Sequence, residues 1–419
     1  MIKVLIIVNR FNLGGPTFNA GLLSKYLSDN FQTLLIGGKE TSTEASSEYI
    51  LNQINTSYSI IPEMSRNVNL ANDYIAYKKI KSIIKDFKPD IVHTHAAKAG
   101  LLGKKAAIAM NVPAIIHTYH GHVFHSYFNK LTTSFYKGLE RFYAKRTDKI
   151  ITISNIQKQE ICTALHIKDN NKFAIIPLGI NLEKFQINSF EKRQEFRSSY
   201  HLDNKTIAIG IIGRLVPIKN HKLFINAFGQ LKRITSKKIK AFIIGDGELY
   251  SELIIYASQL GLTISTHTAY NPNADIFFTS WIKEIDIIYA GLDIVALSSL
   301  NEGTPITLIE AQAAGKPIVS TNVGGVCDTV LQNKTALLSA SRNVNDFLHN
   351  LSKLVANENL RLEFSANGKS FVNQRFHFQR MVNETENLYY DILSQKGLLI
   401  SPVSRRKDYK YSKKLQPSY

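Results

Sequence analysis

Glu302 and Glu310 are the acidic pair whose surroundings best suit ligand binding, and seven residues separate them. Glu302 falls in a loop shaped by glycine and proline, whereas Glu310 lies about one turn into the helix predicted to follow. A carboxylate near a helix start can accept two hydrogen bonds from ribose hydroxyls, and Glu302 can reach a sugar ring. The backbone N–H groups around Gly303 and Thr304 can hold sugar hydroxyls or phosphate oxygens. The structural alternative is a helix whose N-terminal acids only complement its dipole.

A cationic pair, Arg214 and Lys219, follows a predicted strand at residues 206–212. The two residues are five positions apart on a loop whose shape is fixed by Gly213 and Pro217. An arginine fork binds two phosphate oxygens and a lysine adds a point charge, so the pair can neutralise a leaving diphosphate. A solvated surface pair is the alternative, but the position at the carboxyl end of a strand favours ligand contact.

A glycine pair, Gly14 and Gly15, follows the first predicted strand and opens a helix. Glycine lets the backbone turn sharply and approach a ligand, and Pro16 suits a first helical position. The free N–H groups of the helix start can bind a diphosphate. The dinucleotide fingerprint G-x-G-x-x-G is missing, and a plain tight turn is the alternative interpretation.

Six histidines stand in two short stretches, and their spacing permits a metal site. They are His93, His95, His117, His120, His122 and His125. The predicted positions are divided between strand ends and a loop, and no acidic ligand is nearby. We therefore expect no bound metal and structural roles for some of these histidines.

Short apolar segments alternate with helical segments almost to the end of the chain, a pattern typical of doubly wound α/β domains. The first half has predicted strands at residues 4–8, 33–36, 90–93, 114–118, 149–153 and 173–176. The series restarts with strands at residues 206–212, 241–244, 276–278, 294–297 and 317–320. The chain therefore contains one α/β architecture used twice, in agreement with a length that exceeds what one hydrophobic core usually serves.

The pattern predicts an N-terminal domain at residues 1–182 and a second domain at residues 205–377. Residues 183–204 are polar and charged without a clear strand, and we interpret them as a linker. Residues 378–396 show the apolar stripe of a helix, and residues 397–419 form a basic tail that we expect to be disordered. The tail is either solubilising or a contact for acidic lipid headgroups.

The composition is that of an ordinary globular protein, with 44% apolar and 20% charged residues. Only two cysteines, Cys162 and Cys327, are present, which excludes a disulfide framework and indicates a reducing compartment. The apolar N-terminus is short and fits a buried strand better than a signal peptide, and no segment is long enough to span a membrane. We expect a cytoplasmic protein that can lie peripherally on the inner face of the cell membrane.

The net charge of +18 calls for an anionic partner: nucleic acid, a membrane surface or a phosphorylated substrate. No zinc finger, RNP-type pattern or recognition helix is present, so we expect no nucleic acid partner. Aromatic and basic residues alternate at helical spacing in residues 122–146. This helix either lies on an anionic membrane and presents the site to a lipid-linked sugar, or packs on the sheet.

Taken together, these motifs resemble family 4 of the retaining glycosyltransferases, and the resemblance covers nearly the whole chain. The matching segments are Gly14-Gly15, residues 92–95, 117–121, 177–181, 213–221 and 245–249, Glu302 to Glu310, and residues 315–317. The resemblance implies the GT-B fold, in which two Rossmann-like domains face each other across a cleft and a C-terminal helix returns to the first domain. It further implies transfer of a sugar from a nucleotide diphosphate, preferably UDP, to a glycan or lipid-linked acceptor in cell-surface polysaccharide biosynthesis.

The resemblance also implies roles for single residues. Arg214 and Lys219 match the clamp on the donor diphosphate, Glu310 matches the ribose-binding acid, and Glu302 matches the acid at the donor sugar. Gly15 matches the loop that meets the donor phosphate, and His120 matches a histidine facing the sugar near its anomeric carbon. Ser280 stands where the family usually has glycine, which affects the assignment of the base pocket to Trp281 and Ile282.

The two acids thus grip the donor, and no nucleophile pair of the glycosidase kind is evident. We expect same-face substitution, in which the diphosphate departs under Arg214 and Lys219, accepts the proton itself, and needs no divalent metal. His120 would stabilise the charge that develops on the sugar. The alternatives are a UDP-sugar 2-epimerase or hydrolase of the same architecture, and a nonenzymatic anion-binding module.

Overall fold

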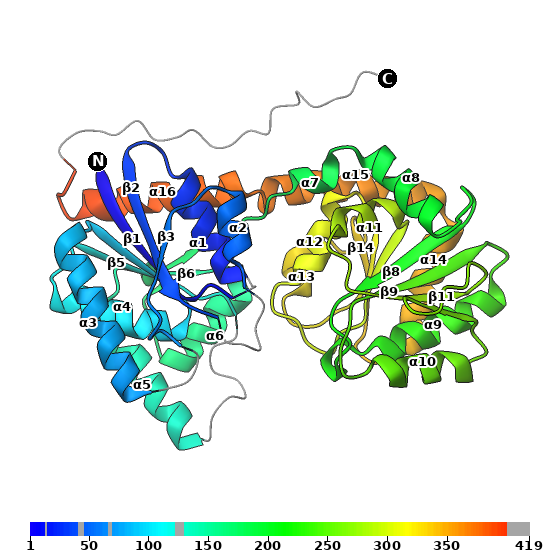
Figure 1. Ribbon diagram of the computed structural model, residues 1–419, viewed down its shortest axis with the longest axis horizontal. Coiled ribbons are helices and arrows are strands. Elements are labelled where there is room, and N and C mark those ends of the chain that lie inside the picture. Colours follow the sequence, from blue (N-terminus) through cyan, green and yellow to red (C-terminus); the bar gives the residue numbers. More distant parts are fainter. Residues whose placement is uncertain (13–14, 41–45, 66–68, 122–129, 400–419) are drawn as a thin grey trace. The chain divides into compact units, whose positions relative to one another are not determined.

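The computed structural model describes residues 1–12, 15–40, 46–65, 69–121 and 130–399. The chain divides into two compact units (Figure 1). Unit 1 comprises Met1–Ile180 together with the chain from Phe376 onward, and unit 2 comprises Asn181–Arg375. Each unit is built on one parallel sheet, which confirms the predicted α/β class with two doubly wound domains.

Unit 1 contains a seven-stranded sheet in the order β3-β2-β1-β4-β5-β6-β7, and all of its ladders are parallel. Its central strands are almost entirely buried because both faces of the sheet are covered by helices. The strands are β1 (Ile2–Arg10), β2 (Phe31–Gly38), β3 (Tyr58–Ile60), β4 (Ile91–His95), β5 (Ala114–Thr118), β6 (Lys149–Thr152) and β7 (Phe173–Ile175).

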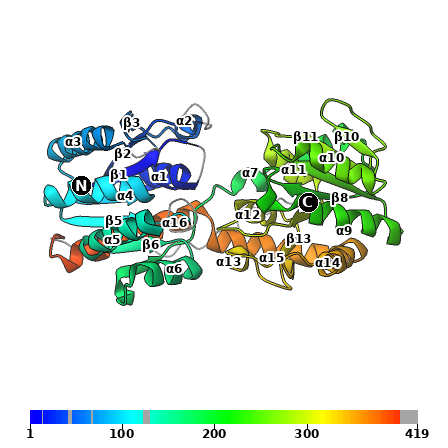
Figure 2. The same ribbon diagram turned by 90° about the horizontal axis from the view of Figure 1, so that it is seen from below.

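Two hydrophobic clusters hold the unit 1 helices to this sheet. One face packs against α1 and α16 through residues such as Leu23 and Met381, and the other packs against α3 and α4 through residues such as Ile80 and Leu102. Figure 2 shows the helices on both faces of the sheet. The helices are α1 (Gly15–Tyr26), α2 (Glu48–Gln53), α3 (Leu70–Phe87), α4 (Ala97–Ala109), α5 (Lys130–Arg146), α6 (Asn155–Leu165), η1 (Asn170–Lys172) and α16 (Phe378–Gln395).

Unit 2 repeats the plan with a seven-stranded parallel sheet in the order β10-β11-β9-β8-β12-β13-β14. One face is covered by α9, α10 and α14, whose apolar stripes include Phe228, Leu253 and Leu351. The strands are β8 (Ile207–Ile212), β9 (Ile239–Ile244), β10 (Ile264–Thr266), β11 (Ile276–Ser280), β12 (Ile294–Leu297), β13 (Ile318–Thr321) and β14 (Ala336–Ser339).

The unit 2 helices precede, separate or follow these strands along the chain. They are α7 (Glu183–Gln186), α8 (Ser189–Ser199), η2 (Pro217–Lys219), α9 (His221–Ile234), α10 (Tyr250–Gln259), α11 (Ile285–Gly291), α12 (Ile306–Ala313), α13 (Val326–Thr329), α14 (Val344–Ala356) and α15 (Glu358–Arg375).

The C-terminal helix α16 is part of the unit 1 core, as the sequence predicts for the helix at residues 378–396. Glu386 is buried and accepts hydrogen bonds from the N–H and the hydroxyl of Ser28, at 3.1 and 2.7 Å. Tyr389 is fully buried and contacts Phe31 and His93. The helix therefore returns the chain to the domain in which it started.

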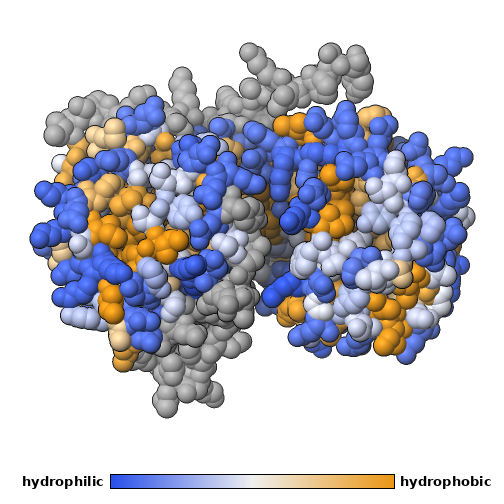
Figure 3. All heavy atoms as spheres, in the orientation of Figure 1, coloured by the Kyte–Doolittle hydropathy of each residue, from blue (hydrophilic) through white to orange (hydrophobic). Residues whose placement is uncertain are grey.

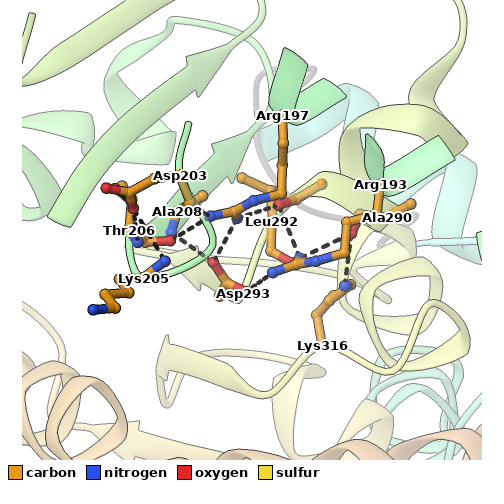
Figure 4. A network of polar contacts seen from close by, with 11 residues as sticks. Arg193, Arg197, Asp203, Lys205, Thr206, Ala208, Ala290, Leu292, Asp293 and Lys316 are labelled. Carbon is orange, nitrogen blue, oxygen red and sulfur yellow. Dashed lines mark hydrogen bonds and ion pairs between the residues drawn. The ribbon is translucent and has the colours of Figure 1, made fainter. Parts of the chain in front are cut away.

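Residues 183–204, predicted to be a linker, instead form α7 and α8 and belong to unit 2. Figure 4 shows how α8 is fixed: Arg193 and Arg197 both bond to Asp293, at 2.7 and 3.2 Å, and to the carbonyls that end α11. Lys316 donates to the Ala290 carbonyl at 2.9 Å. Cations at the C-terminus of a helix satisfy its free carbonyls and complement its dipole, so this polar segment folds through long-range contacts.

The sequence analysis did not predict three short strands, β3, β10 and β14. Each of them is an edge strand of its sheet. Edge strands of three or four residues carry little apolar pattern because only part of each is buried. Among the described residues, the helices are too short or too polar to cross a bilayer. On the face that Figure 3 shows, hydrophilic side chains predominate and apolar ones gather in a few patches.

Candidate active site

The predicted donor-binding residues of unit 2 gather at one edge of its sheet. Arg214 follows β8, Trp281 follows β11, and Glu302 follows β12, and all three positions are carboxyl ends of parallel strands. In the sheet, β11, β9, β8 and β12 are consecutive neighbours. Topology therefore collects loops from distant parts of the sequence at the edge where open α/β sheets bind ligands.

Lys219 and Glu302 are in direct contact at this edge. The Nζ atom of Lys219 lies 2.6 Å from Oε1 of Glu302, and the Ser299 hydroxyl donates to the same carboxylate oxygen at 2.6 Å. The Ser298 hydroxyl donates to the backbone carbonyls of Lys219 and Asn220, at 3.1 and 3.0 Å. Two serines at the end of β12 thus fix both the η2 turn and the Glu302 side chain.

Glu310 occupies a separate position, in α12. Its Oε2 accepts a hydrogen bond of 3.0 Å from the hydroxyl of the buried Tyr289. Burial raises the pKa of Glu310 to about 7, while the charge of Lys184 and the bond from Tyr289 act in the opposite direction. Lys184 lies on α7, whose Phe185 packs edge-to-face on Tyr289 with ring centroids 5.5 Å apart. The segment predicted as a linker thus supports the carboxylate predicted to bind ribose.

Arg214 is exposed, and its guanidinium makes no hydrogen bond or ion pair with the part of the chain that the structure describes. Its loop is held by neighbouring backbone: the Leu215 N–H donates to the Asp246 carbonyl at 2.9 Å. A Cβ on Gly245 would lie 2.1 Å from the Gly213 carbonyl oxygen, so this approach requires glycine. The backbone of Arg214 is therefore fixed and its guanidinium is free to take a ligand.

Ser280 adopts the left-handed conformation, with φ of 57°. This explains why the resemblance leads one to expect glycine there, since only glycine enters that region without strain. The Ser280 hydroxyl donates to Asp246 at 3.3 Å, a contact that glycine could not make. Trp281 is 55% exposed and Ile282 is partly buried beside it. The structure thus leaves an open aromatic surface at the position of the expected base pocket.

The loop with Gly303 and Thr304 rests on a second glycine pair that the sequence analysis did not single out. The Gly325 N–H donates to the Glu302 carbonyl at 3.0 Å, and a Cβ there would lie 1.9 Å from the Gly303 oxygen. A Cβ on Gly324, whose φ is +50°, would lie 2.0 Å from the Glu302 oxygen. The sequence does contain a signal for this support, because Gly324 and Gly325 are adjacent and follow the predicted strand at residues 317–320.

In unit 1, Gly15 is the first residue of α1, and His120 lies two residues beyond β5. Gly14 lies outside the described residues. The Thr17 hydroxyl donates to the carbonyls of Arg10 and Asn12, at 3.3 and 3.1 Å, and ties the helix start to the end of β1. A Cβ added to Gly15 would meet no described atom within 4 Å, so there is room for a ligand on this side of the residue.

His120 bonds to another histidine: its Nε2 lies 2.8 Å from Nδ1 of His95. Burial lowers the pKa of His120 to about 3, so the ring is neutral at physiological pH. His93 and His117 are buried nearby, and His122 and His125 lie outside the described residues. Within the described ranges, no group of three histidine, cysteine or acidic residues is arranged to hold a metal ion.

The helix α5 covers most of the aromatic segment at residues 122–146, and its described part packs on the domain. Glu140 is buried, pairs with Lys104 of α4 at 2.7 Å, and accepts a bond of 2.9 Å from the Tyr119 hydroxyl. Tyr143 is also buried, whereas Phe142 is 49% exposed with the Arg146 guanidinium over its ring. Residues 122–129 are not described, so the membrane interpretation stays a prediction for that part.

Two family models match the chain, one in each unit. The model "Glycosyltransferase Family 4" matches residues 23–184, and "Glycosyl transferases group 1" matches residues 192–371. The second match contains Arg214, Lys219, Glu302 and Glu310, so the unit 2 loops described above belong to the matched region.

Two similar proteins come from bacteria. The chain is 30% identical over 339 residues to the UDP-Gal:alpha-D-GlcNAc-diphosphoundecaprenol alpha-1,3-galactosyltransferase of Escherichia coli, covering 80% of this chain and 84% of that protein. It is 27% identical over 351 residues to the capsular polysaccharide biosynthesis glycosyltransferase CapM of Staphylococcus aureus, covering 80% and 85%.

Among solved structures, HepE of Anabaena in complex with UDP has a similar fold. The TM-score is 0.75 with 17% sequence identity, and the match covers 93% of this chain and 100% of HepE. This likeness confirms the GT-B fold that the sequence resemblance predicts.

Proposed function

The chain belongs to glycosyltransferase family 4, and we propose that it transfers a sugar from a UDP-sugar, with retention of configuration, to a glycan or lipid-linked acceptor in cell-surface polysaccharide biosynthesis. The observation that carries this proposal is the contact of Lys219 with Glu302 at the carboxyl edge of β8 and β12, with Arg214 on the loop after β8 and Glu310 in the helix α12 that follows the Glu302 loop. Two cations and two acids at one edge suit a ligand that combines a diphosphate with hydroxyl groups.

Each unit 2 residue then has a distinct task. Glu310, ionised, accepts two hydrogen bonds from the ribose, and the exposed Trp281 with Ile282 covers the base. Arg214 and Lys219 bind the diphosphate, while Glu302 and the N–H groups of Gly303 and Thr304 bind the donor sugar. The ion pair of Lys219 with Glu302 holds both side chains ready while the donor is absent.

The reaction is a substitution on one face of the sugar. The bond from the anomeric carbon to the diphosphate oxygen breaks, and Arg214 and Lys219 stabilise the negative charge that develops on that oxygen. The acceptor hydroxyl forms the new bond on the same face, and its proton passes to the departing phosphate. His120 and the start of α1 at Gly15 serve this step from unit 1. With these cations present, the proposal requires no divalent metal.

The relatives support the nature of both substrates. The E. coli relative is named for a UDP-galactose donor and a diphosphoundecaprenol-linked acceptor, CapM is named for capsular polysaccharide biosynthesis, and HepE was solved with UDP. A lipid-linked acceptor would bring the enzyme to the inner face of the cell membrane, where its net charge of +18 favours anionic lipid.

The direct test is incubation of the purified protein with labelled UDP-sugars and a lipid-diphosphate-linked sugar. The expected result is a product extended by one sugar, whose anomeric coupling in the NMR spectrum has the same configuration as the donor. A product of opposite configuration would exclude the same-face step. An epimerised UDP-sugar or free sugar without any extended product would favour the epimerase or hydrolase alternative.

A further inference from the structure

A column of buried histidines stands behind His120 in unit 1. His93 and His95 lie on β4, with ring centroids 4.2 Å apart, and His95 and His120 stack with centroids 5.1 Å apart and planes 24° apart. His93 and His95 are completely buried, and His120 is partly exposed at the end of the column. The ring predicted to face the sugar is thus one end of a stacked set.

Both ring nitrogens of His93 are occupied. Its Nδ1 lies 2.6 Å from the Tyr389 hydroxyl, and its Nε2 lies 2.7 Å from the Thr118 hydroxyl. Tyr389 belongs to α16, so the C-terminal helix anchors the base of the column. His93 therefore cannot offer a hydrogen bond to either of the other two rings.

His95 and His120 share one hydrogen bond and keep one free nitrogen each. The bond joins Nδ1 of His95 to Nε2 of His120 at 2.8 Å. The two remaining atoms, Nε2 of His95 and Nδ1 of His120, are buried and have no hydrogen-bond partner among the described residues. Buried polar atoms without partners are rare in native proteins, and at the edge of a ligand site they indicate a missing ligand.

The shared bond joins two neutral rings. Burial lowers the pKa of His95 well below its usual value, and the nearby rings of His93, His120 and His117 lower it further. Lys104, on α4, acts in the same direction on His117. Since each neutral ring has one N–H and one lone pair, one histidine donates in this bond and the other accepts.

Burial decides which one donates. If His120 donated, His95 would keep an N–H at Nε2 with no partner in the completely buried part of the column. An orphaned buried N–H is rarer, and therefore costlier, than an orphaned acceptor. The favourable arrangement leaves a lone pair on His95 Nε2 and an N–H on His120 Nδ1. This Nδ1 is itself buried, but it belongs to the partly exposed residue at the end of the column, where a ligand can accept its hydrogen bond.

We propose that His95 is a positioning residue that donates from Nδ1 to His120 Nε2 and so fixes His120 as a hydrogen-bond donor toward an oxygen of the sugar substrate. This inference rests on the proposed function for the identity of the ligand. It has a mechanistic consequence: with Nδ1 protonated and the Nε2 lone pair engaged, His120 cannot remove a proton from the acceptor hydroxyl. The proton must leave by another route, as the departing phosphate provides.

The tautomers can be measured without any substrate. In long-range ¹H–¹⁵N spectra of protein labelled with ¹⁵N-histidine, His95 and His120 should each show a protonated Nδ1 and an unprotonated Nε2 from pH 6 to 8. The His95→Phe and His120→Phe variants assign the signals by their loss. A proton on His120 Nε2 would overturn the proposal, and this result is independent of whether the protein transfers sugar.

Kinetics of matched variants separate positioning from a structural role. His95→Phe keeps a ring in the column but removes the donor, and should lower kcat about tenfold or more with the KM for the UDP-sugar nearly unchanged. His95→Asn returns an amide nitrogen near the Nδ1 position and should restore most of the loss. Thr94→Val is the control, because it removes only a hydroxyl on the other face of β4, which donates to the Ile116 carbonyl at 3.3 Å and lies 2.8 Å from His117 Nδ1.

The outcomes are decisive in both directions. The proposal fails if His95→Phe turns over like the wild type, or if His95→Asn is as impaired as His95→Phe while both keep the wild-type Tm. It is supported if kcat falls in His95→Phe, recovers in His95→Asn and is unchanged in Thr94→Val.

Discussion

Lys219 Nζ lies 2.6 Å from Oε1 of Glu302, so the cation assigned to the diphosphate and the acid assigned to the sugar neutralise each other before the donor binds. Both side chains are largely buried, at 24% and 10% exposure, and the pair is less screened than a surface salt bridge. A bound diphosphate would compete with Glu302 for Lys219. Under the proposed function, the pair would therefore couple occupation of the phosphate position to release of the acid toward the sugar.

Glu302→Gln and Lys219→Met should consequently differ in their effects. Removing the charge of Glu302 frees Lys219, so UDP affinity should be retained or increased while turnover falls about a hundredfold or more. Lys219→Met should lower both UDP affinity and turnover, because it removes a cation from the leaving group. Calorimetric titration with UDP and steady-state kinetics check this, and equal loss of UDP affinity in both variants would contradict the coupling.

Donor binding should depend on pH through Glu310. Its pKa is raised to about 7, so the carboxylate is ionised above that pH and protonated below it. Affinity for a UDP-sugar should fall by up to about tenfold between pH 8 and pH 6 as the ribose acceptor is lost. Glu310→Gln should bind more weakly and without this pH dependence. A UDP-sugar is the right probe because its diphosphate carries no group that titrates near neutral pH.

The same shift predicts a stability effect of opposite sign. The folded state binds more protons than the unfolded state between the unperturbed pKa of 4.5 and the folded value of about 7, so stability falls as pH rises through that window. Without ligand, Glu310→Gln should therefore raise Tm at pH 8 and have little effect at pH 4.5. If Glu310→Gln were less stable than the wild type at pH 8, burial of the ionised carboxylate would not destabilise the folded state.

Tyr289→Phe should move the pH profile of donor binding upward. The hydroxyl of Tyr289 donates to Glu310 and favours its ionised form, so its loss raises the pKa of the carboxyl further. At pH 7, UDP-sugar affinity should fall several-fold, a loss of about 1 kcal/mol, and should recover at pH 9. Tyr200→Phe is the matched control, since Tyr200 packs among Phe196, Phe242 and Phe277 of the same unit, away from Glu310.

Gly325→Ala should displace the sugar-binding loop. The added Cβ would lie 1.9 Å from the carbonyl oxygen of Gly303, so the backbone must shift at the residues assigned to the donor sugar. Turnover should fall by at least about tenfold. Gly229→Ala, in α9 of the same unit, provides the control, because its Cβ would meet nothing closer than 3.8 Å and alanine favours a helix. Equal turnover in the two variants would exclude the supporting role of Gly325.

The sequence by itself determined the doubly wound class, the central strands and the motifs at their ends. These features are local: buried parallel strands are continuous apolar runs, and loops that turn sharply at a ligand need glycine and proline. The carboxyl ends of parallel strands share one edge of a sheet. The sequence therefore predicts that the motifs after β8, β11 and β12 lie at the same edge.

Only the tertiary structure decided the partners of those residues. Residues 183–204 have no apolar pattern, yet they form helices because Arg193 and Arg197 reach Asp293 about 100 residues further along the chain. The hydrogen bonds of Tyr289 to Glu310 and of His95 to His120 do not correspond to any pattern in the sequence either. Hydrogen bonds of single side chains depend on distances set by packing of the whole unit, whereas strand patterns depend only on which neighbours along the chain are buried.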